Sequence, residues 1–274
     1  MGYSKPIETT KIYLENADLP EHSDTYAVIP HKDVIENTTN MLNAAGFRIK
    51  KEIYRANVNA NVAQGIYHIV PNTNDFDILD EDELGMMFGW TNSYDKSTRF
   101  QCAVGAYVMV CQNGMVAGDM MSYARKHTGS AHQDIKMQIA NQIKNAEKHY
   151  KRIITDKNNL KSVTLDLKKQ SELIGRLYIE KEIINSTQIN IIKKEIDSPS
   201  YTYNGDKDSA WYFYNHVTHA LKETHPRTWL KDTQKFHEFI IGDLKGQMGI
   251  KYKDTVDPNQ TDLNDLFEII NVSV

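Results

Sequence analysis

The stretch Arg99–Cys111, RFQCAVGAYVMVC, decides the fold of this chain. Its even positions from Phe100 to Val110 are uniformly apolar, and the polar side chains fall between them. A period of two is typical of a β-strand with one buried face. One regular strand of this kind would place Cys102 and Cys111 on opposite faces, which makes a disulfide between them improbable.

A partner for this strand precedes it in the chain. The run Met86–Thr91, MMFGWT, leads into Asn92–Ser97, NSYDKS, which is a cluster of turn-forming residues. Gln112–Gly114, QNG, then ends the second strand with strong turn chemistry. The central element is therefore expected to be an antiparallel hairpin.

Two more strands and a helix are expected before this hairpin. Phe47–Ala56, FRIKKEIYRA, alternates imperfectly, and Asn61–Val70, NVAQGIYHIV, is richer in β-branched residues. His31–Ala45 has apolar residues at helical spacing, and Gly46 can end that helix in a left-handed conformation. The first part of the chain thus predicts a second hairpin and one covering helix.

After Ser130 the period of the apolar residues changes from two to 3.6, which indicates an amphipathic helix. Its apolar stripe consists of Ile135, Ile139, Ile143, Ala146, Tyr150 and Ile153. Further helices are expected between about residues 160 and 196, and then over Ser209–Lys222 and Thr228–Ile241. The fold class is α+β: antiparallel β-hairpins form a sheet that packs against long amphipathic helices, and the C-terminal part is helical.

These elements suggest a simple domain organisation. Residues 1–30 are expected to be an irregular lead-in, and residues 31–248 a single α+β domain. Within it, 47–116 would be rich in sheet and 130–245 helical. Residues 249–274 are expected to be an acidic tail.

The composition excludes several protein classes. Of 274 residues, 40% are hydrophobic and 25% are charged, which is too apolar for a disordered chain. No run approaches the roughly 18–20 apolar residues of a membrane span. Two cysteines cannot form a disulfide framework, and the N-terminus MGYSKPIETT lacks the layout of a signal peptide. We therefore expect a soluble protein of the reducing cytoplasm.

The formal net charge of −4 hides an uneven distribution. Residues 1–95 carry 7 basic and 15 acidic side chains, and residues 96–120 carry 2 and 1. Residues 121–195 carry 15 and 8, and residues 196–274 carry 8 and 12. A local surplus of positive charge is typical of a polyanion-binding surface, because surface fields are screened within about 10 Å.

This charge surplus predicts single-stranded DNA as the partner, bound by an oligomer of the chain without catalysis. Cations would follow the phosphates while Trp90 and Tyr94 stack on bases. The expected cations are Lys96, Arg99, Arg125, Lys126, Lys136, Lys144, Lys148, Lys151 and Arg152.

Each of these residues also has a structural explanation. Lysines of this kind commonly solvate the outer faces of long helices. Trp90 can be a core residue beside Phe88, and Asn92, Ser93 and Asp95 can bond to their own backbone in the turn.

The sequence offers little support for catalysis. It contains no HExxH pattern, no P-loop and no GxSxG elbow, and we expect no metal ion and no cofactor. An enzyme with a pocket near Asp119 and His127 is a third, less favoured hypothesis. The best histidine groupings are His127 with His132, and His216, His219 and His225.

Four short motifs follow one another in order: NSYDKS at Asn92–Ser97, VCQNG at Val110–Gly114, the pair His127 and Thr128, and Trp211, Tyr214, Asn215 and Thr218 within one predicted helix. They resemble the phage/plasmid-like protein family, a domain family of unknown function found in phages and mobile elements. The resemblance covers about residues 85–220. It implies a phage-encoded protein that acts in the host cytoplasm, in DNA metabolism or on the host.

Hairpins followed by a long basic helix also look like the layout of single-strand annealing proteins, which is an analogy at the level of the fold. The alternative function is a factor that binds and inhibits or redirects a host defence or replication protein. Its interaction surface would be the acidic first third of the chain, with the run Asp75–Glu83.

Overall fold

The computed structural model describes residues 7–21, 28–72, 81–117, 121–122 and 131–247. Within these ranges the chain forms one antiparallel sheet in the order β1-β2-β3-β4-β5-β6, and β7 also pairs with β5. The strands are β1 Ile7–Thr9, β2 Phe47–Ala56, β3 Val62–Pro71, β4 Leu84–Ser93, β5 Gln101–Val108, β6 Gly114–Met115 and β7 Met121–Ser122. The predicted α+β class is confirmed.

The central hairpin of β4 and β5 forms as the alternation predicts, with Trp90 opposite Cys102. The end of the second strand differs from the prediction. β5 stops at Val108, and Val110 is 54% exposed although it continues the apolar alternation. Gln112 adopts a left-handed φ of 59° in the turn that follows, so Cys111 lies in this turn and not on a strand face.

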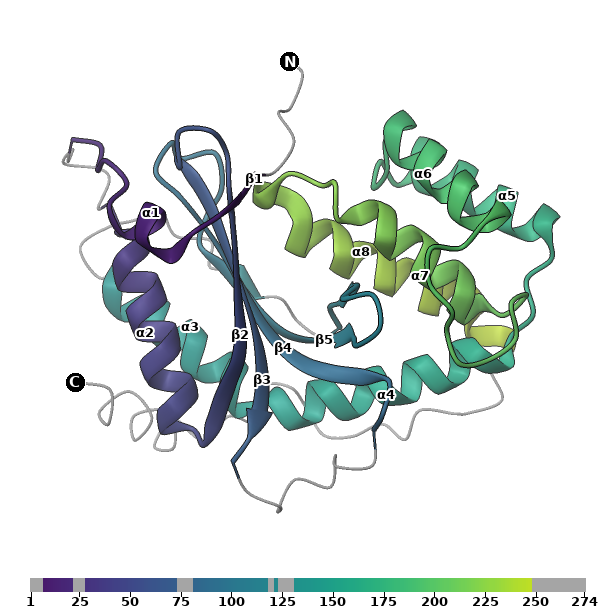
Figure 1. The fold of residues 1–274 in the computed structure, drawn as a ribbon, viewed down its shortest axis with the longest axis horizontal. Coiled ribbons are helices and arrows are strands. Elements are labelled where there is room, and N and C mark those ends of the chain that lie inside the picture. Colours follow the sequence, from purple (N-terminus) through teal and green to yellow (C-terminus); the bar gives the residue numbers. More distant parts are fainter. Residues whose placement is uncertain (1–6, 22–27, 73–80, 118–120, 123–130, 248–274) are drawn as a thin grey trace.

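Helices cover both faces of the sheet (Figure 1). On one face lie α2, His31–Ala44, α3, Ala131–Lys144, and α4, Ala146–Ser162. On the other lies α8, Pro226–Leu244, and α7, Ala210–Leu221, packs beside it against α4 and α8. Nearly every residue of β4 and β5 is buried, whichever face of the sheet it lies on. This is expected for strands that are covered on both faces.

The apolar stripe of the long helix is confirmed, but it spans two helices. The side of α3 and α4 that faces the core buries Ile135, Ile139, Ile143 and Tyr150. Asn145 separates the two helices, and its side-chain amide donates to the backbone oxygen of Asn141, 2.9 Å away. The helix His31–Ala45 is confirmed as α2, which is followed by Gly46 with a φ of 81°.

The remaining helices form the C-terminal part. They are α5 Leu167–Gly175, which continues as a π-helical turn over Arg176–Glu180, and α6 Ser186–Asp197, which packs against α7. The hydroxyl of Ser209 caps α7, and Pro226 begins α8. Eleven of the twelve α7 residues are buried, so α7 is a core helix with no amphipathic outer face.

The expected irregular lead-in needs a correction. Its described part contains β1, in which Ile7 pairs with Ala56, and a short helix, α1, over Lys11–Glu15. The open edge of β2 accepts β1 as a further strand, and the Thr10 side chain caps α1. The predicted tail lies outside the described residues. No helix of the described ranges is long and apolar enough to cross a membrane.

Candidate functional site

The NSYDKS motif organises the turn between β4 and β5. The side-chain amide of Asn92 lies 3.0 Å from Nδ1 of His31, and the ring of Tyr94 stacks on His31 with centroids 3.9 Å apart. Ser93 donates to a backbone oxygen of the turn, and Asp95 accepts a backbone N–H two residues on. These contacts are turn and packing chemistry.

The second and fourth motifs meet each other. The side-chain amide of Asn113 donates to the backbone oxygen of Asn215 at 3.0 Å and to its side-chain oxygen at 3.2 Å. Asn215 in turn donates to Trp211 O, and Thr218 donates to Tyr214 O. All five side chains are buried. The two motifs therefore join the turn after β5 to α7.

The expectation that Trp90 and Tyr94 stack on bases is corrected by their burial. Trp90 is 0% exposed, and its Nε1 donates to the hydroxyl of Tyr67 at 3.2 Å. Tyr94 is 5% exposed and covered by His31. Trp90 of β4 lies in the main core, and Tyr94, which follows β4, packs with Val28 in a smaller buried cluster.

Five of the predicted cations lie on α3 and α4, and we call them the basic helix face: Lys136, Lys144, Lys148, Lys151 and Arg152. Lys148, Lys151 and Arg152 are exposed. Carboxylates accompany two of them. Nζ of Lys151 lies 2.7 Å from Oε1 of Glu147, and Nε of Arg152 lies 3.9 Å from Oδ2 of Asp156.

The other predicted cations lie elsewhere. Lys96 and Arg99 are exposed in the turn between β4 and β5. β4 begins at Leu84 and ends at this turn. The hydroxyl of Tyr150 on α4 donates to the backbone oxygen of Leu84, so this part of α4 lies at the far end of the strand from Lys96 and Arg99. Arg125 and Lys126 lie outside the described residues, as do Asp119, His127 and Thr128.

A different set of cations meets on the other face of the sheet, and a β-bulge in β2 places them there. Ile49 pairs with Ile69 and Lys51 pairs with His68, so two residues of β2 oppose one residue of β3. Ile49 packs against the main core, whereas Lys51 lines a cleft on the opposite face. The extra residue, Lys50, reverses the alternation of the rest of β2.

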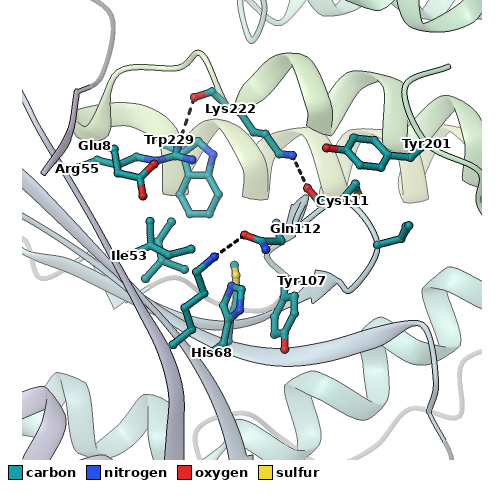
Figure 2. Close-up of a pocket in the computed structure, with 15 residues that line it drawn as sticks. Glu8, Ile53, Arg55, His68, Tyr107, Cys111, Gln112, Tyr201, Lys222 and Trp229 are labelled. Atoms are coloured by element: carbon teal, nitrogen blue, oxygen red, sulfur yellow. Dashed lines mark hydrogen bonds between the residues drawn. The ribbon is translucent and has the colours of Figure 1, made fainter. Parts of the chain in front are cut away.

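This cleft has a volume of about 340 Å³. Its floor is the sheet face beyond the bulge, and Figure 2 shows its side chains. The floor consists of Lys51, Ile53 and Arg55 from β2, Ile66 and His68 from β3, Met87 from β4 and Tyr107 from β5. The rings of His68 and Tyr107 stack with centroids 3.6 Å apart.

The opposite wall comes from the turn after β5 and from α7 and α8. Cys111 and Gln112 line the cleft from the turn, Lys222 from the C-terminal end of α7, and Trp229 from α8. A Cβ at Gly114 would lie 2.7 Å from the Trp229 ring, so only glycine allows this close packing. Figure 2 shows Lys222 facing His68 and Tyr107 across the cleft.

Each cation of the cleft is bonded to an uncharged oxygen. Nζ of Lys51 donates to Oε1 of Gln112 at 3.0 Å, Nζ of Lys222 donates to the backbone oxygen of Cys111, and Nη1 of Arg55 donates to the backbone oxygen of Lys222 at 3.3 Å. Among the described residues, no carboxylate lies within 4.0 Å of their charged nitrogens. Within the described ranges, ion pairs therefore do not neutralise these three positive charges.

Burial changes the ionisation of these groups. It lowers the pKa of Arg55, and the more distant carboxylates of Glu8 and Glu223 oppose that shift. Burial also lowers the pKa of Lys222, and the charge of Arg55 acts in the same direction. Burial and then Lys51 lower the pKa of His68 to about 4. His68 is therefore neutral at pH 7, while an arginine and two lysines supply the charge.

The described part of the acidic run forms ion pairs with lysines of α4. Oε1 of Glu81 lies 2.6 Å from Nζ of Lys157, and Glu83 is paired with Lys161. Residues 75–80 lie outside the described ranges. Within the part of the chain that the structure describes, no three His, Cys, Asp or Glu side chains are arranged to hold a metal ion.

A family model described as a domain of unknown function, DUF932, matches residues 19–256. The chain belongs to the DUF932 family. The DUF932 match includes every cleft residue except Glu8. It confirms the resemblance to a family of unknown function, whereas the association with phages and mobile elements stays a prediction. No curated protein and no solved structure matches this DUF932 chain.

Local sequence patterns do not reveal the cleft of this DUF932 domain. Lys51 and Arg55 fall in the acidic first third and Lys222 in the acidic last part, so counting charges by segment hides all three. One signal was present: FRIKKEIYRA alternates imperfectly, and that irregularity is the bulge.

Proposed function

We propose that the protein binds single-stranded DNA without catalysing a reaction, and that the cleft is the main contact. One observation carries this proposal: Lys51, Arg55 and Lys222 converge on one cleft, and each is bonded there to an uncharged oxygen. A phosphate oxygen is a stronger acceptor for these groups than an amide oxygen, because its negative charge adds a direct attraction to the cation.

The apolar part of the cleft supports a nucleic acid over a simple anion. Tyr107, stacked on His68, and Trp229 line the same space as the cations. Aromatic surface beside a cationic track is the usual combination in single-strand binding, and each stacked base contributes about 1–3 kcal/mol. Tyr107, which is partly exposed, thus replaces Trp90 and Tyr94 in the proposal, whereas Trp229 is as buried as Tyr94 and forms part of the wall.

The basic helix face has a secondary part in this proposal. It lies on α3 and α4, across the sheet from the cleft, and would add a contribution that does not depend on the base sequence. Lys96 and Arg99 would add two further cations at the turn between β4 and β5. The proposed setting, which rests on the family resemblance, is phage DNA replication or recombination in the host cytoplasm by a homo-oligomer.

Fluorescence anisotropy with a labelled single-stranded oligonucleotide, titrated over a series of salt concentrations, tests the proposal. We expect binding that weakens steeply with salt. The double variant Lys51→Glu with Lys222→Glu should bind at least about tenfold more weakly. It should also reduce the salt slope by about 1.4, at about 0.7 for each lost phosphate contact.

Lys168→Glu with Lys193→Glu is the matched control, since both lysines are exposed, lie on α5 and α6, and do not line the cleft. It changes the net charge equally and should leave binding within about twofold of the unaltered protein, because distant exposed charges are screened. A chain that shows no binding at low salt rules the function out. Equal losses in both double variants would rule out the cleft as the contact.

A further inference from the structure

We infer that the cleft binds a terminal phosphate, the phosphomonoester group of a nucleotide, in preference to the phosphodiesters within a strand. The inference deepens the proposed function and rests on it for the strand, though not for the phosphate. Four observations carry it: the charge of the cleft, the donors that its cations still offer, its size, and its aromatic floor.

The charge of the cleft matches a group with nearly two negative charges. Among the described residues that line it, Lys51, Arg55 and Lys222 are cations and Glu8 is the one carboxylate. The balance is therefore two positive charges. A phosphodiester within a strand carries one negative charge, whereas a phosphomonoester carries about 1.5 to 2 at pH 7. An internal phosphate would leave about one positive charge of the cleft without a partner.

The cations can still donate to a phosphate. A lysine has three N–H donors and an arginine has five, and each cation here uses one of them on an uncharged oxygen. Lys51 comes from the sheet, Lys222 from the end of α7, and Arg55 bonds to the backbone oxygen of Lys222. The donors therefore reach the cleft from two walls, and a group with three equivalent oxygens can accept from both.

The size of the cleft suits one nucleotide unit. Its volume of about 340 Å³ is near the lower end of the roughly 300–1,000 Å³ of small-molecule sites. The stacked pair of His68 and Tyr107 forms the apolar floor of the space, and the buried ring of Trp229 lies in its wall. A phosphate held by the cations thus leaves the partly exposed ring of Tyr107 for the attached base. The same chemistry could come from a free nucleotide or from the end of a DNA strand.

Binding of matched ligands tests the inference. One oligonucleotide sequence is prepared with hydroxyl groups at both ends, with a 5′-phosphate, and with a 3′-phosphate. Adenosine, adenosine 5′-monophosphate and inorganic phosphate are tested as competitors. We expect one phosphorylated strand to bind at least about tenfold more tightly than the hydroxyl form, because a further charged hydrogen-bonding group enters the cleft. We expect the monophosphate to compete and adenosine not to.

The competitor results separate the two sources. If adenosine 5′-monophosphate binds more tightly than any phosphorylated strand, the ligand is a free nucleotide. Tighter binding of the phosphorylated strand identifies a strand end. Equal affinity for all three strands, with no competition by the monophosphate, overturns the inference even if DNA binds. No binding of any strand, with binding of the monophosphate, keeps the inference and rules out the proposed function.

A pair of variants ties the preference to the cleft. Lys222→Gln keeps a donor for the backbone oxygen of Cys111 and removes the charge. It should reduce the ratio of phosphorylated to hydroxyl affinity to about twofold or less. Lys231→Gln, an exposed position of α8 that does not line the cleft, should leave the ratio unchanged. If Lys222→Gln keeps the full ratio with an unchanged melting temperature, the phosphate does not lie in this cleft.

Discussion

The cleft and the basic helix face both gather lysines and arginines, yet their cations have different partners. On the helix face Lys151 is paired with Glu147, and Arg152 lies near the buried carboxylate of Asp156. In the cleft, Lys51 and Lys222 are bonded to uncharged oxygens. A local surplus of basic residues in the sequence is therefore a poor guide to where unneutralised charge lies in the fold.

The two surfaces also differ in how they depend on the core. The wall of the cleft is core: Trp229 is 4% exposed and packs with Ile66, Met87 and Leu230. The side chains of Lys148, Lys151 and Arg152 are exposed on α4. Substitutions in the cleft should therefore affect stability and binding together, whereas substitutions on the helix face should affect neither strongly. Four predictions test this difference.

The largest expected effect is on stability. Trp229→Ala should lower the free energy of unfolding by about 3–5 kcal/mol, because it removes a buried aromatic ring and leaves a cavity against Gly114. Denaturant titration followed by circular dichroism measures it. A loss below about 1 kcal/mol would mean that the cleft wall is not part of the core.

The next effect is on affinity. Arg55→Met keeps much of the side-chain volume but removes the charge and the bond to the backbone oxygen of Lys222. We expect affinity for a 5′- or 3′-phosphorylated strand to fall about ten- to 150-fold, which corresponds to the roughly 1.5–3 kcal/mol of a hydrogen bond to a charged group. Isothermal titration calorimetry at fixed salt checks it. Unchanged affinity would remove Arg55 from the contact.

The third effect is on His68, which has a pKa of about 4 in the free protein. A bound anion stabilises the protonated ring and so raises this pKa, by about one unit for about 1.4 kcal/mol of interaction. Between the free and bound pKa values, binding takes up a proton. NMR titration of the His68 ring with and without inorganic phosphate measures both values. An unchanged or lowered pKa would place the anion away from His68.

The smallest effect is expected on the helix face. Lys144→Glu with Lys148→Glu should weaken strand binding by less than about threefold at 150 mM salt, and should change stability by less than about 0.5 kcal/mol. Anisotropy and thermal melting measure these quantities in parallel with the cleft variants. A loss as large as that of the cleft variants would show that both surfaces contact the strand.

Periodicity predicted most of the fold. The alternation of Arg99–Cys111 identified the central hairpin, and the spacing from Ile135 to Ile153 identified the buried side of α3 and α4. Both signals are local, because neighbours in the sequence share one face of one element. Sequence could not give the end of β5, since the left-handed turn at Gln112 overrides the apolar pattern through Val110.

The candidate site could not be predicted in the same way. Lys51, Arg55 and Lys222 come together through the pairing of β2 with its neighbours and through the packing of α7, at sequence separations of up to 171 residues. No local period carries that information. Trp90 is the opposite case. It is an aromatic residue of a motif beside a polar turn, which is the pattern of a stacking residue, yet it lies in the core.

The bulge at Lys50 has a consequence for comparing sequences within the DUF932 family. Ile49 pairs with Ile69 and Lys51 pairs with His68, which are neighbours in β3, so the ladder skips Lys50. A relative that lacks this one residue would therefore have a regular β2 and would still place Lys51 and Arg55 on the cleft face. In an alignment of family members, a one-residue gap at this position is compatible with an anion site, whereas a gap at one of the paired residues that follow would turn the rest of the strand to the other face.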